Sequence, residues 1–239
     1  NLAGKSVNCR YTAKNKREIL DSRLNATRVL SEAVLQAQHP PKIWFNAASA
    51  TIYRHAEDRP MDEFTGEIGS DFSMDVCKAW EKSFYDLTLP ATRKVILRMS
   101  ITMGINGGVY LRFKNLVRFG LGGKMGNGKQ MMSWIHVEDI ARAISFIIEK
   151  ENINGIINVT SPNPVSNATF MSAVRKAMFM PFGLPTPRWF LAFGAFVIGT
   201  ETELILKSRW VIPQKLLNAG FTFKYAELND LVNNVNSKR

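Results

Sequence analysis

Residues 12–37 carry apolar side chains at helical spacing. Leu20, Leu24 and Leu30 recur with Lys, Arg and Glu between them, which is the pattern of a helix with one apolar face. Thr12 precedes this run and belongs to the residue types that cap helix N-termini. The pattern therefore predicts an amphipathic helix over residues 12–37.

Short apolar runs then alternate with further helical patterns. Such runs are typical of strands buried on both faces, and helices between them imply a parallel sheet covered on both sides. The predicted fold class is therefore α/β, with a doubly wound parallel sheet. The predicted strands are 42–48, 93–101 and 155–160, and the predicted helices between and after them are 75–85 and 137–149.

The composition of the chain changes after the second predicted strand. Residues 104–129 are rich in glycine and are expected to cross into a smaller lobe before Trp134 returns to the sheet. After Thr160, helical patterns are interrupted by prolines at 181–187, which mark a loop. Two domains are predicted: residues 1–105 and 131–161 form the sheet domain, and residues 106–130 and 162–239 form a small, mainly helical C-terminal lobe.

The first residues, Asn1-Leu2-Ala3-Gly4, are typical of the end of a strand. The Gly-x-Gly-x-x-Gly turn that holds a dinucleotide pyrophosphate occurs nowhere in the chain. We therefore expect one of two situations. Either a preceding segment of about 60 residues, part of a two-βαβ half, is missing, or cofactor binding is not what this chain does.

The formal net charge of +11 raises the question of nucleic-acid binding, because Lys and Arg can neutralise phosphates. The basic residues cluster only modestly, at 10–17 and at Lys238 and Arg239, and no RNA-recognition strand or zinc-finger spacing is present. A solvated basic helix face explains the charge more simply. We expect no nucleic-acid partner, whereas a phosphate-rich small ligand would suit the same sign of charge.

The cysteines and the apolar stretches indicate in which cellular compartment the protein is expected. Cys9 and Cys77 lie far apart without metal-ligand spacing, which indicates a reducing compartment and no metal site. The longest apolar stretch, residues 189–199, is shorter than the ~20 residues that span a bilayer, and no secretory leader opens the chain. We expect a cytoplasmic protein without a membrane partner.

Several motifs occur in the order expected of one protein family. Each is weak alone, but the ordered set resembles the extended short-chain dehydrogenases/reductases, and more narrowly the YfcH-like epimerase family proteins. The motifs are Asn1-Leu2-Ala3-Gly4, Ala-Ser-Ala-Thr-Ile-Tyr at 48–53, Asp-Phe-Ser-Met-Asp-Val-Cys-Lys-Ala-Trp-Glu at 71–81, Leu-Arg-Met-Ser at 97–100, Trp-Ile-His-Val-Glu-Asp at 134–139 and Ser-Pro-Asn-Pro at 161–164.

The resemblance implies a Rossmann-type fold that binds NADP or NAD, with a lean towards NADP. It places Ala3 and Gly4 against the adenine-side ribose and Ser100 near the nicotinamide. The alternatives are a tight turn for Gly4 and, for Arg98, an ion pair within the fold. The implied cofactor-binding residues are Ala3, Gly4, Ala48, Arg98, Met99 and Ser100.

The resemblance also implies catalytic roles for Ser49 and Tyr53. Ser49 falls where extended enzymes place a serine that hydrogen-bonds the reacting carbonyl or hydroxyl, so it would orient that group and stabilise charge. Tyr53 lies in a segment that often reaches the mouth of the active site. The alternatives are a strand-end hydrogen bond for Ser49 and a buried aromatic with a bonded hydroxyl for Tyr53.

The chain departs from the larger superfamily at the catalytic helix. Those enzymes use Tyr-x-x-x-Lys, in which the ammonium lowers the pKa of the phenol. Aligning Glu81 with the acidic residue after that motif puts Ser73 at the tyrosine position and Cys77 at the lysine position. A serine alone is too weak an acid, and a helical cysteine is more often a core residue than a nucleophile.

Two further residues bear on the substrate class and on the catalytic acid or base. Met132 stands near the position of an arginine that grips nucleotide-sugar diphosphates, so a nucleotide-sugar substrate is not expected. His136 has the pKa range of an acid or base, but it begins a predicted helix, where capping or packing is more ordinary.

Two functional hypotheses follow. The leading one is an oxidoreductase or epimerase-like enzyme that uses NADP or NAD on a small substrate, with a proton donor other than the usual tyrosine. The competing one is a non-catalytic nucleotide-binding regulatory protein, since some family members carry a cell-division-inhibitor label. The expected partner is a small-molecule substrate, and a homodimer is compatible with the sequence.

Overall fold

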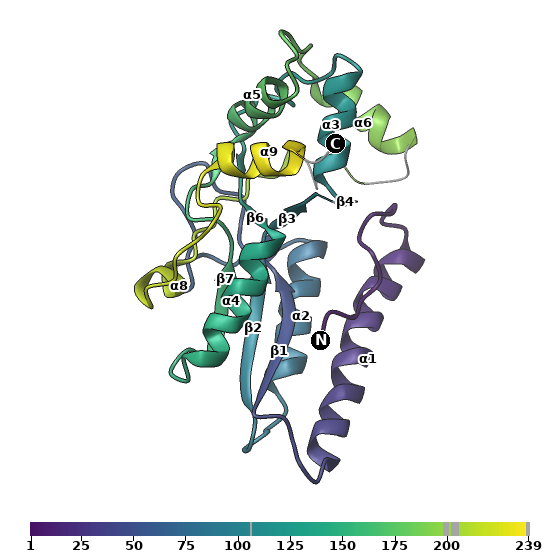
Figure 1. Ribbon diagram of the computed structural model, residues 1–239. Coiled ribbons are helices and arrows are strands. Elements are labelled where there is room, and N and C mark those ends of the chain that lie inside the picture. The colour runs from purple at the N-terminus through teal and green to yellow at the C-terminus, as the bar shows by residue number, and fades with distance from the viewer. Residues whose placement is uncertain (106, 198–200, 202–205, 238–239) are drawn as a thin grey trace.

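The central sheet contains three parallel strands. The computed structural model describes residues 1–105, 107–197, 201 and 206–237 (Figure 1). Strands β1 (Ile43–Ser49), β2 (Arg93–Met99) and β7 (Gly155–Val159) lie in the order β1-β2-β7. Ser49 pairs with Met99, and Met99 pairs with Val159. The carboxyl ends of all three strands therefore lie at one edge of the sheet.

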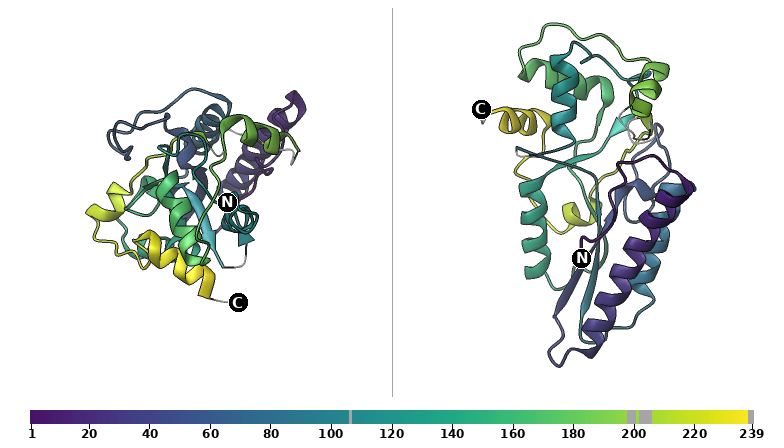
Figure 2. Two further views of the ribbon diagram at one scale, coloured as in Figure 1. Left: turned by 90° about the horizontal axis from the view of Figure 1, so that it is seen from above. Right: turned by 90° about the vertical axis from the view of Figure 1, so that its right-hand side faces the viewer.

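Helices cover both faces of this sheet. Helices α1 (Ala13–Gln36) and α2 (Phe72–Tyr85) lie on one face and α4 (Val137–Glu149) lies on the other (Figures 1 and 2). The predicted α/β fold class with a parallel sheet is confirmed. Thr12 caps α1 as predicted, and Asp71 caps α2, which begins three residues before the predicted helix.

The core follows from the alternation of side chains along β2. Leu97 packs with Ile147 of α4, whereas Ile96 packs with Phe84 of α2 on the opposite face. Both faces of the strand are apolar because each is covered by a helix. Full burial of each such side chain stabilises the fold by roughly 1.5–3 kcal/mol.

The first residue continues the sheet beyond β1. The amino group of Asn1 donates to the carbonyl of Phe45 at 2.7 Å, and the amide of Ala47 donates to the carbonyl of Asn1 at 2.9 Å. The Asn1 side chain donates to Asn46 Oδ1 at 2.7 Å. These bonds are what a strand end beside β1 would make, in keeping with the pattern of the first four residues.

Two details of the predicted sheet are wrong. The strand predicted over 93–101 ends at Met99, and Ile101 begins a new strand, β3 (Ile101–Gly104). Trp134 does not return to the central sheet, because β6 (Trp134–His136) pairs with β3 in a second sheet that also contains β4 (Gly107–Gly108). The amide of Ser100 still donates to the carbonyl of Val159, whereas the amide of Ile101 donates to that of Ser133. The chain therefore leaves the central sheet at Ser100.

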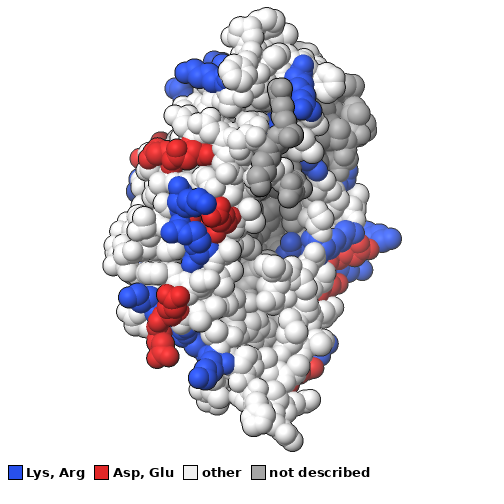
Figure 3. All heavy atoms as spheres, viewed as in Figure 1, with Lys and Arg blue, Asp and Glu red and all other residues white. Residues whose placement is uncertain are grey.

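The C-terminal half of the chain contains a helical region with a core of its own. Its core contains Tyr110, Phe170 and Leu231, and it also buries Met132. In the view of Figure 3, the described atoms above residues 228–237 include Lys and Arg side chains but no Asp or Glu. The exact domain boundaries stay a prediction. The elements of this region are α3 (Tyr110–Arg118), β5 (Met131–Met132), β8 (Val165–Ser166), α5 (Asn167–Ala177), α6 (Arg188–Val197) and α9 (Leu228–Ser237). In contrast, α8 (Gln214–Asn218) packs against β7 of the central sheet, and the short η1 (Ala50–Ile52) follows β1.

Among the described helices, none combines the length and the apolar character needed to cross a membrane.

Candidate active site

Two serine hydroxyls lie at the carboxyl edge of the central sheet. Ser49 ends β1, and its Oγ accepts a hydrogen bond from the amide of Thr51 at 3.2 Å, which caps η1. No hydrogen bond donated by this hydroxyl is found among the described residues. Ser100 follows β2, and its Oγ is buried without a hydrogen-bond partner in the described part of the chain. Ligands of open α/β sheets bind at this edge, so both hydroxyls remain available to one.

The other predicted cofactor residues have mixed surroundings. Ala48 is buried in the core beside Trp44, and Met99 packs partly against the α4 side of the sheet. Ala3 is exposed, and its amide donates to Asn1 Oδ1 at 3.0 Å. A Cβ atom at Gly4 would lie 3.1 Å from the Arg23 side chain. Gly4 therefore permits the close approach of Arg23.

Tyr53 and Arg98 belong to one buried polar network. Arg98 binds both carboxylate oxygens of Glu81 at 2.7 Å each and donates to the Tyr53 hydroxyl at 2.9 Å. Tyr53 donates in turn to Asn158 Oδ1 at 3.0 Å. Arg98 thus has the ion-pair role that the sequence left as an alternative to cofactor binding. Tyr53, which is 1% exposed, has its hydroxyl occupied on both sides.

The network continues across the sheet to a second carboxylate. The amide of Asn158 donates to Glu63 Oε1 at 2.8 Å, and the amide of Lys215 donates to Glu63 Oε2 at 3.3 Å. Burial raises the pKa of Glu63. Burial also raises the pKa of Tyr53, against the lowering effect of Arg98. Tyr53 is therefore a protonated hydrogen-bond donor at neutral pH.

The face of α2 that carries Ser73 and Cys77 is turned towards η1. Cys77 packs in a core cluster with Ala50 and Ile52, and Ser73 lies one turn earlier on the same helix face. Burial, with Glu81 adding to it, raises the pKa of Cys77 to about 12. Cys77 therefore stays a neutral thiol in the core, and it replaces neither the ammonium of the usual lysine nor a thiolate nucleophile.

A tyrosine from a different element approaches the Ser73 position. The hydroxyl of Tyr11 lies 3.4 Å from Ser73 Oγ, and the Tyr11 ring packs edge-on against Phe72 with 4.9 Å between ring centroids. Sequence reasoning missed Tyr11, because it stands in the irregular segment before α1 and belongs to no periodic pattern or motif.

A lysine from the C-terminal region lies at the same end of α2. Lys207 forms an ion pair with Asp71, the cap of α2, and its side chain is only 14% exposed. Its Nζ lies 3.7 Å from Met74 Sδ. Burial and the neighbouring Arg209 lower the pKa of Lys207 to about 8. No sequence signal connects Lys207 to α2, since they lie more than a hundred residues apart.

His136 has the capping role. It is the N-cap of α4, and its Nδ1 accepts from the amide of Glu138 at 3.1 Å. The other ring nitrogen must then carry the proton and donate to Asn234 Oδ1 at 3.1 Å. The ring also lies 3.9 Å from that of Tyr225. A neutral imidazole with both nitrogens occupied satisfies this site.

The pH dependence of stability tests this cap. Burial lowers the pKa of His136 below 6.5, so the neutral form contributes stability that is present above pH 6.5 and is lost as the pH falls through the lowered pKa. We expect His136→Asn, which keeps a capping acceptor, to remove this loss in thermal unfolding measured from neutral to acid pH. The exposed His39→Asn is the control and should leave the slope unchanged. An unchanged slope in His136→Asn would contradict the assignment.

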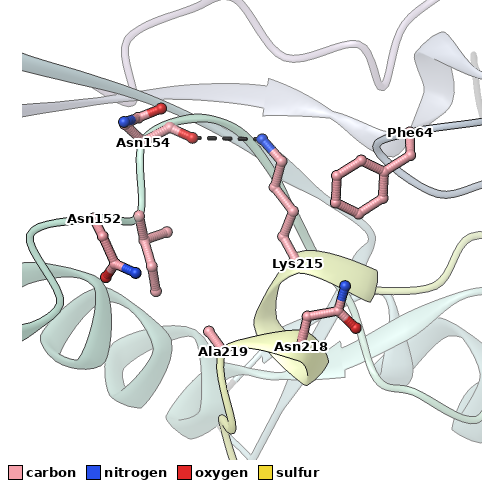
Figure 4. Close-up of a pocket in the computed structure, with 7 residues that line it drawn as sticks. Phe64, Asn152, Asn154, Lys215, Asn218 and Ala219 are labelled. Atoms are coloured by element: carbon pink, nitrogen blue, oxygen red, sulfur yellow. Dashed lines mark hydrogen bonds between the residues drawn. The ribbon is translucent and has the colours of Figure 1, made fainter.

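An open pocket lies at the opposite edge of the sheet. It has a volume of about 280 Å³ and is lined by Asn154, which precedes β7, and by Lys215 and Phe64 (Figure 4). Lys215 Nζ donates to the carbonyl of Asn154 at 3.5 Å. None of the predicted site residues lines it, so this pocket is separate from the candidate active site. Within the described residues, no group of three or more His, Cys, Asp or Glu is placed to hold a metal ion.

Comparison with known proteins decides the family. The chain is 34% identical over 228 residues to the epimerase family protein YfhF of Bacillus subtilis, covering 95% of this chain and 74% of that protein. The chain belongs to the epimerase family. The model of the NAD dependent epimerase/dehydratase family matches residues 89–160, and a domain of unknown function, DUF1731, matches residues 186–235. The resemblance found in the sequence is confirmed.

Further relatives agree with this membership. The epimerase family protein ML0860 of Mycobacterium leprae is 34% identical over 233 residues, covering 96% of this chain and 74% of that protein. The crystal structure of human epimerase family protein SDR39U1 (isoform 2) with NADPH has a TM-score of 0.92 and 27% identity, covering all of this chain and 81% of the human one. A nucleoside-diphosphate sugar epimerase from Corynebacterium glutamicum has a TM-score of 0.74 and 25% identity, covering 96% of this chain and 45% of that chain.

Proposed function

We propose that this epimerase family protein is an NAD(P)-dependent oxidoreductase that acts on a small substrate with a non-standard proton donor. The observation that carries the proposal is the pair of serine hydroxyls, Ser49 and Ser100, at the carboxyl edge of the parallel sheet. The NADPH in the similar human structure supports NADP over NAD. Cytoplasmic location and the homodimer stay predictions from the sequence.

The residues present fit a nicotinamide cofactor at this edge. A buried hydroxyl without a partner is unfavourable unless a ligand satisfies it, and Ser100 Oγ is such a group. Ser100 would hold the cofactor near the end of β2. Ala3 and Gly4, which follow Asn1 on the other side of β1, would lie further along the same edge of the sheet. The bound cofactor supplies or accepts hydride. Ser49 would donate its free hydroxyl proton to the substrate oxygen and so orient it.

The proton donor in this proposal is Tyr11, assisted by Lys207. Tyr11 places a phenol 3.4 Å from the Ser73 hydroxyl, where the larger superfamily has its tyrosine. Lys207 places an ammonium with a lowered pKa at the same helix end. An ammonium near a phenol favours the phenolate and lowers its pKa. The two groups reach α2 from other elements and together replace the pair lost at Ser73 and Cys77.

A second candidate function is nucleotide sensing without turnover. It is favoured by the neutral, buried Cys77 at the lysine position, because a regulatory protein needs no proton relay. The two functions differ in one observable: both require cofactor binding, but only the enzyme oxidises the reduced cofactor when a substrate is added.

Calorimetric titration with NADPH and NADH tests the proposal, and the Ser100→Ala variant tests whether the Ser100 hydroxyl binds the cofactor. Removing an unpartnered hydroxyl should leave the melting temperature unchanged or raise it, whereas loss of a hydrogen bond to the cofactor should weaken its affinity about tenfold. Ser237→Ala, which removes an exposed hydroxyl on α9, is the matched control. A carbonyl panel followed by the absorbance of reduced nicotinamide then separates enzyme from sensor. Absence of binding of either nucleotide would overturn both functions.

A further inference from the structure

Two stretches of the chain that include α3, α5 and α6 of the helical lobe have an unusual charge composition. Residues 102–137 and 152–200 contain no Asp or Glu, although they contain eight Lys and Arg residues. These two stretches therefore account for most of the formal net charge of +11. Figure 3 shows the result on one face, where the described atoms above α9 are white and blue. A charge of one sign concentrated on one end of a protein favours a partner of the opposite sign.

Two loops are joined at the far end of this lobe. The loop between α5 and α6 forms the outermost part of the molecule, next to the end of α3 (Figures 1 and 2). The amide of Leu184 donates to the carbonyl of Gly120 at 2.8 Å, and the amide of Gly123 donates to that of Leu184 at 3.1 Å. A Cβ atom at Gly123 would lie 2.5 Å from the backbone of Leu184, and one at Gly183 would lie 2.5 Å from the backbone of Gly122. The two backbones are thus held in close contact that only glycine allows.

This joined structure exposes large apolar side chains. Phe119, Phe179, Phe182 and Leu184, together called the aromatic tip, are 81%, 89%, 68% and 60% exposed. Phe179 has a φ of 56°, in the left-handed region that a bulky residue avoids. Phe179 follows the C-cap of α5, and the amides of Phe179 and Met180 donate to carbonyls of the last helical turn, so this conformation ends the helix and turns the chain into the loop. A hydrogen-bonded backbone that holds four apolar side chains in water indicates an interaction surface.

Basic side chains flank the aromatic tip. Arg118, Lys124, Lys176 and Arg188 are exposed and adjoin the tip residues in the chain. The nearest acidic residues in the sequence are Glu138, Glu151 and Glu201. Among the described residues these four cations form no ion pair, so their charge is available to a partner.

We propose that the aromatic tip and its flanking basic residues dock the protein on the surface of an anionic lipid bilayer. Exposed aromatic and leucine side chains enter the boundary between headgroups and acyl chains, while Lys and Arg pair with the phosphates above it. Each basic residue near an anionic membrane strengthens binding about fivefold. A bilayer offers an apolar layer into which the exposed side chains of the tip can insert. Nucleic acid would leave Leu184 in water, and a second copy would bring like charges together.

Docking of this kind is distinct from spanning. The sequence-based expectation of no membrane partner depended on the absence of a long apolar segment and of a leader, and neither is needed by a protein that lies on a membrane surface. The exposed tip residues are separated in the chain and come together only in the fold. The proposal therefore replaces that expectation.

Co-sedimentation with vesicles tests the proposal. The protein should sediment with phosphatidylcholine vesicles that contain about 30 mol% phosphatidylglycerol, and not with phosphatidylcholine alone. Phe179→Ser combined with Phe182→Ser should weaken binding at least about tenfold through lost apolar insertion. Lys176→Glu combined with Arg188→Glu should weaken it at least about 25-fold, because the contributions of two basic residues are lost. All four positions are exposed, so the melting temperature should stay that of the unaltered protein.

Matched controls use the sheet domain. Phe64→Ser removes another exposed phenylalanine, and Arg17→Glu reverses an exposed charge on α1; both should sediment normally. Failure to sediment with anionic vesicles, or equal sedimentation of the tip variants, would overturn the proposal. So would a concentration-dependent dimer, or duplex or RNA binding, that the tip variants abolish in place of vesicle binding, because the tip would then serve a second copy or a nucleic acid.

Discussion

Arg98→Met is expected to lower the free energy of unfolding by about 3–5 kcal/mol, because it leaves a buried carboxylate without its partner. Glu81 is 7% exposed and receives two hydrogen bonds from Arg98. The same substitution removes the donor to the Tyr53 hydroxyl. Urea unfolding measures the loss directly.

A double-mutant cycle separates the ion pair from the packing. Glu81→Leu alone should also be strongly destabilising, since it leaves the Arg98 cation buried. The double variant Arg98→Met with Glu81→Leu should recover much of the loss, because an apolar pair of similar volume needs no charge partner. If each single substitution lowers stability by less than about 1 kcal/mol, the pair behaves as a solvated surface pair, which would contradict a buried Arg98–Glu81 ion pair.

Most of the fold was predictable because local pattern and tertiary burial agree. The apolar residues at 95–97 and at 156–157 follow one another without alternation because helices cover both faces of the sheet, and Thr12 marked the start of α1 as a capping residue should. The break at Ser100 was not predictable. Ile101 is as apolar as the residues before it, and only the pairing of its amide with Ser133 shows that the chain has changed sheets.

The candidate site was predictable where it follows the strands and not where it depends on distant contacts. Ser49 and Ser100 stand at strand ends, so their edge of the sheet follows from the strand pattern. The partners of Tyr53 could not be found in this way, since Asn158 lies 105 residues away and Arg98 45 residues away. Tyr11 and Lys207 likewise reach α2 only through tertiary packing.

Tyr11→Phe is expected to lower kcat by about 10²–10⁴-fold if Tyr11 relays the proton. The substitution keeps the ring that packs on Phe72 and removes only the hydroxyl, so stability and cofactor affinity should stay unchanged. The measurement is steady-state kinetics with the carbonyl compound that gives turnover, beside calorimetric titration of the cofactor. Tyr85→Phe, a tyrosine at the far end of α2, is the control.

Lys207 makes the same proposal testable through pH. With a pKa of about 8, Lys207 is an ammonium below pH 8 and a neutral amine above it, so kcat should be steady below pH 8 and fall as the pH rises through it. Lys207→Met should give a low, flat profile, because the cation that favours the phenolate is absent at every pH. Full activity in Tyr11→Phe, or an unaltered falling limb in Lys207→Met, would show that the proton relay depends on a group other than Tyr11 and Lys207.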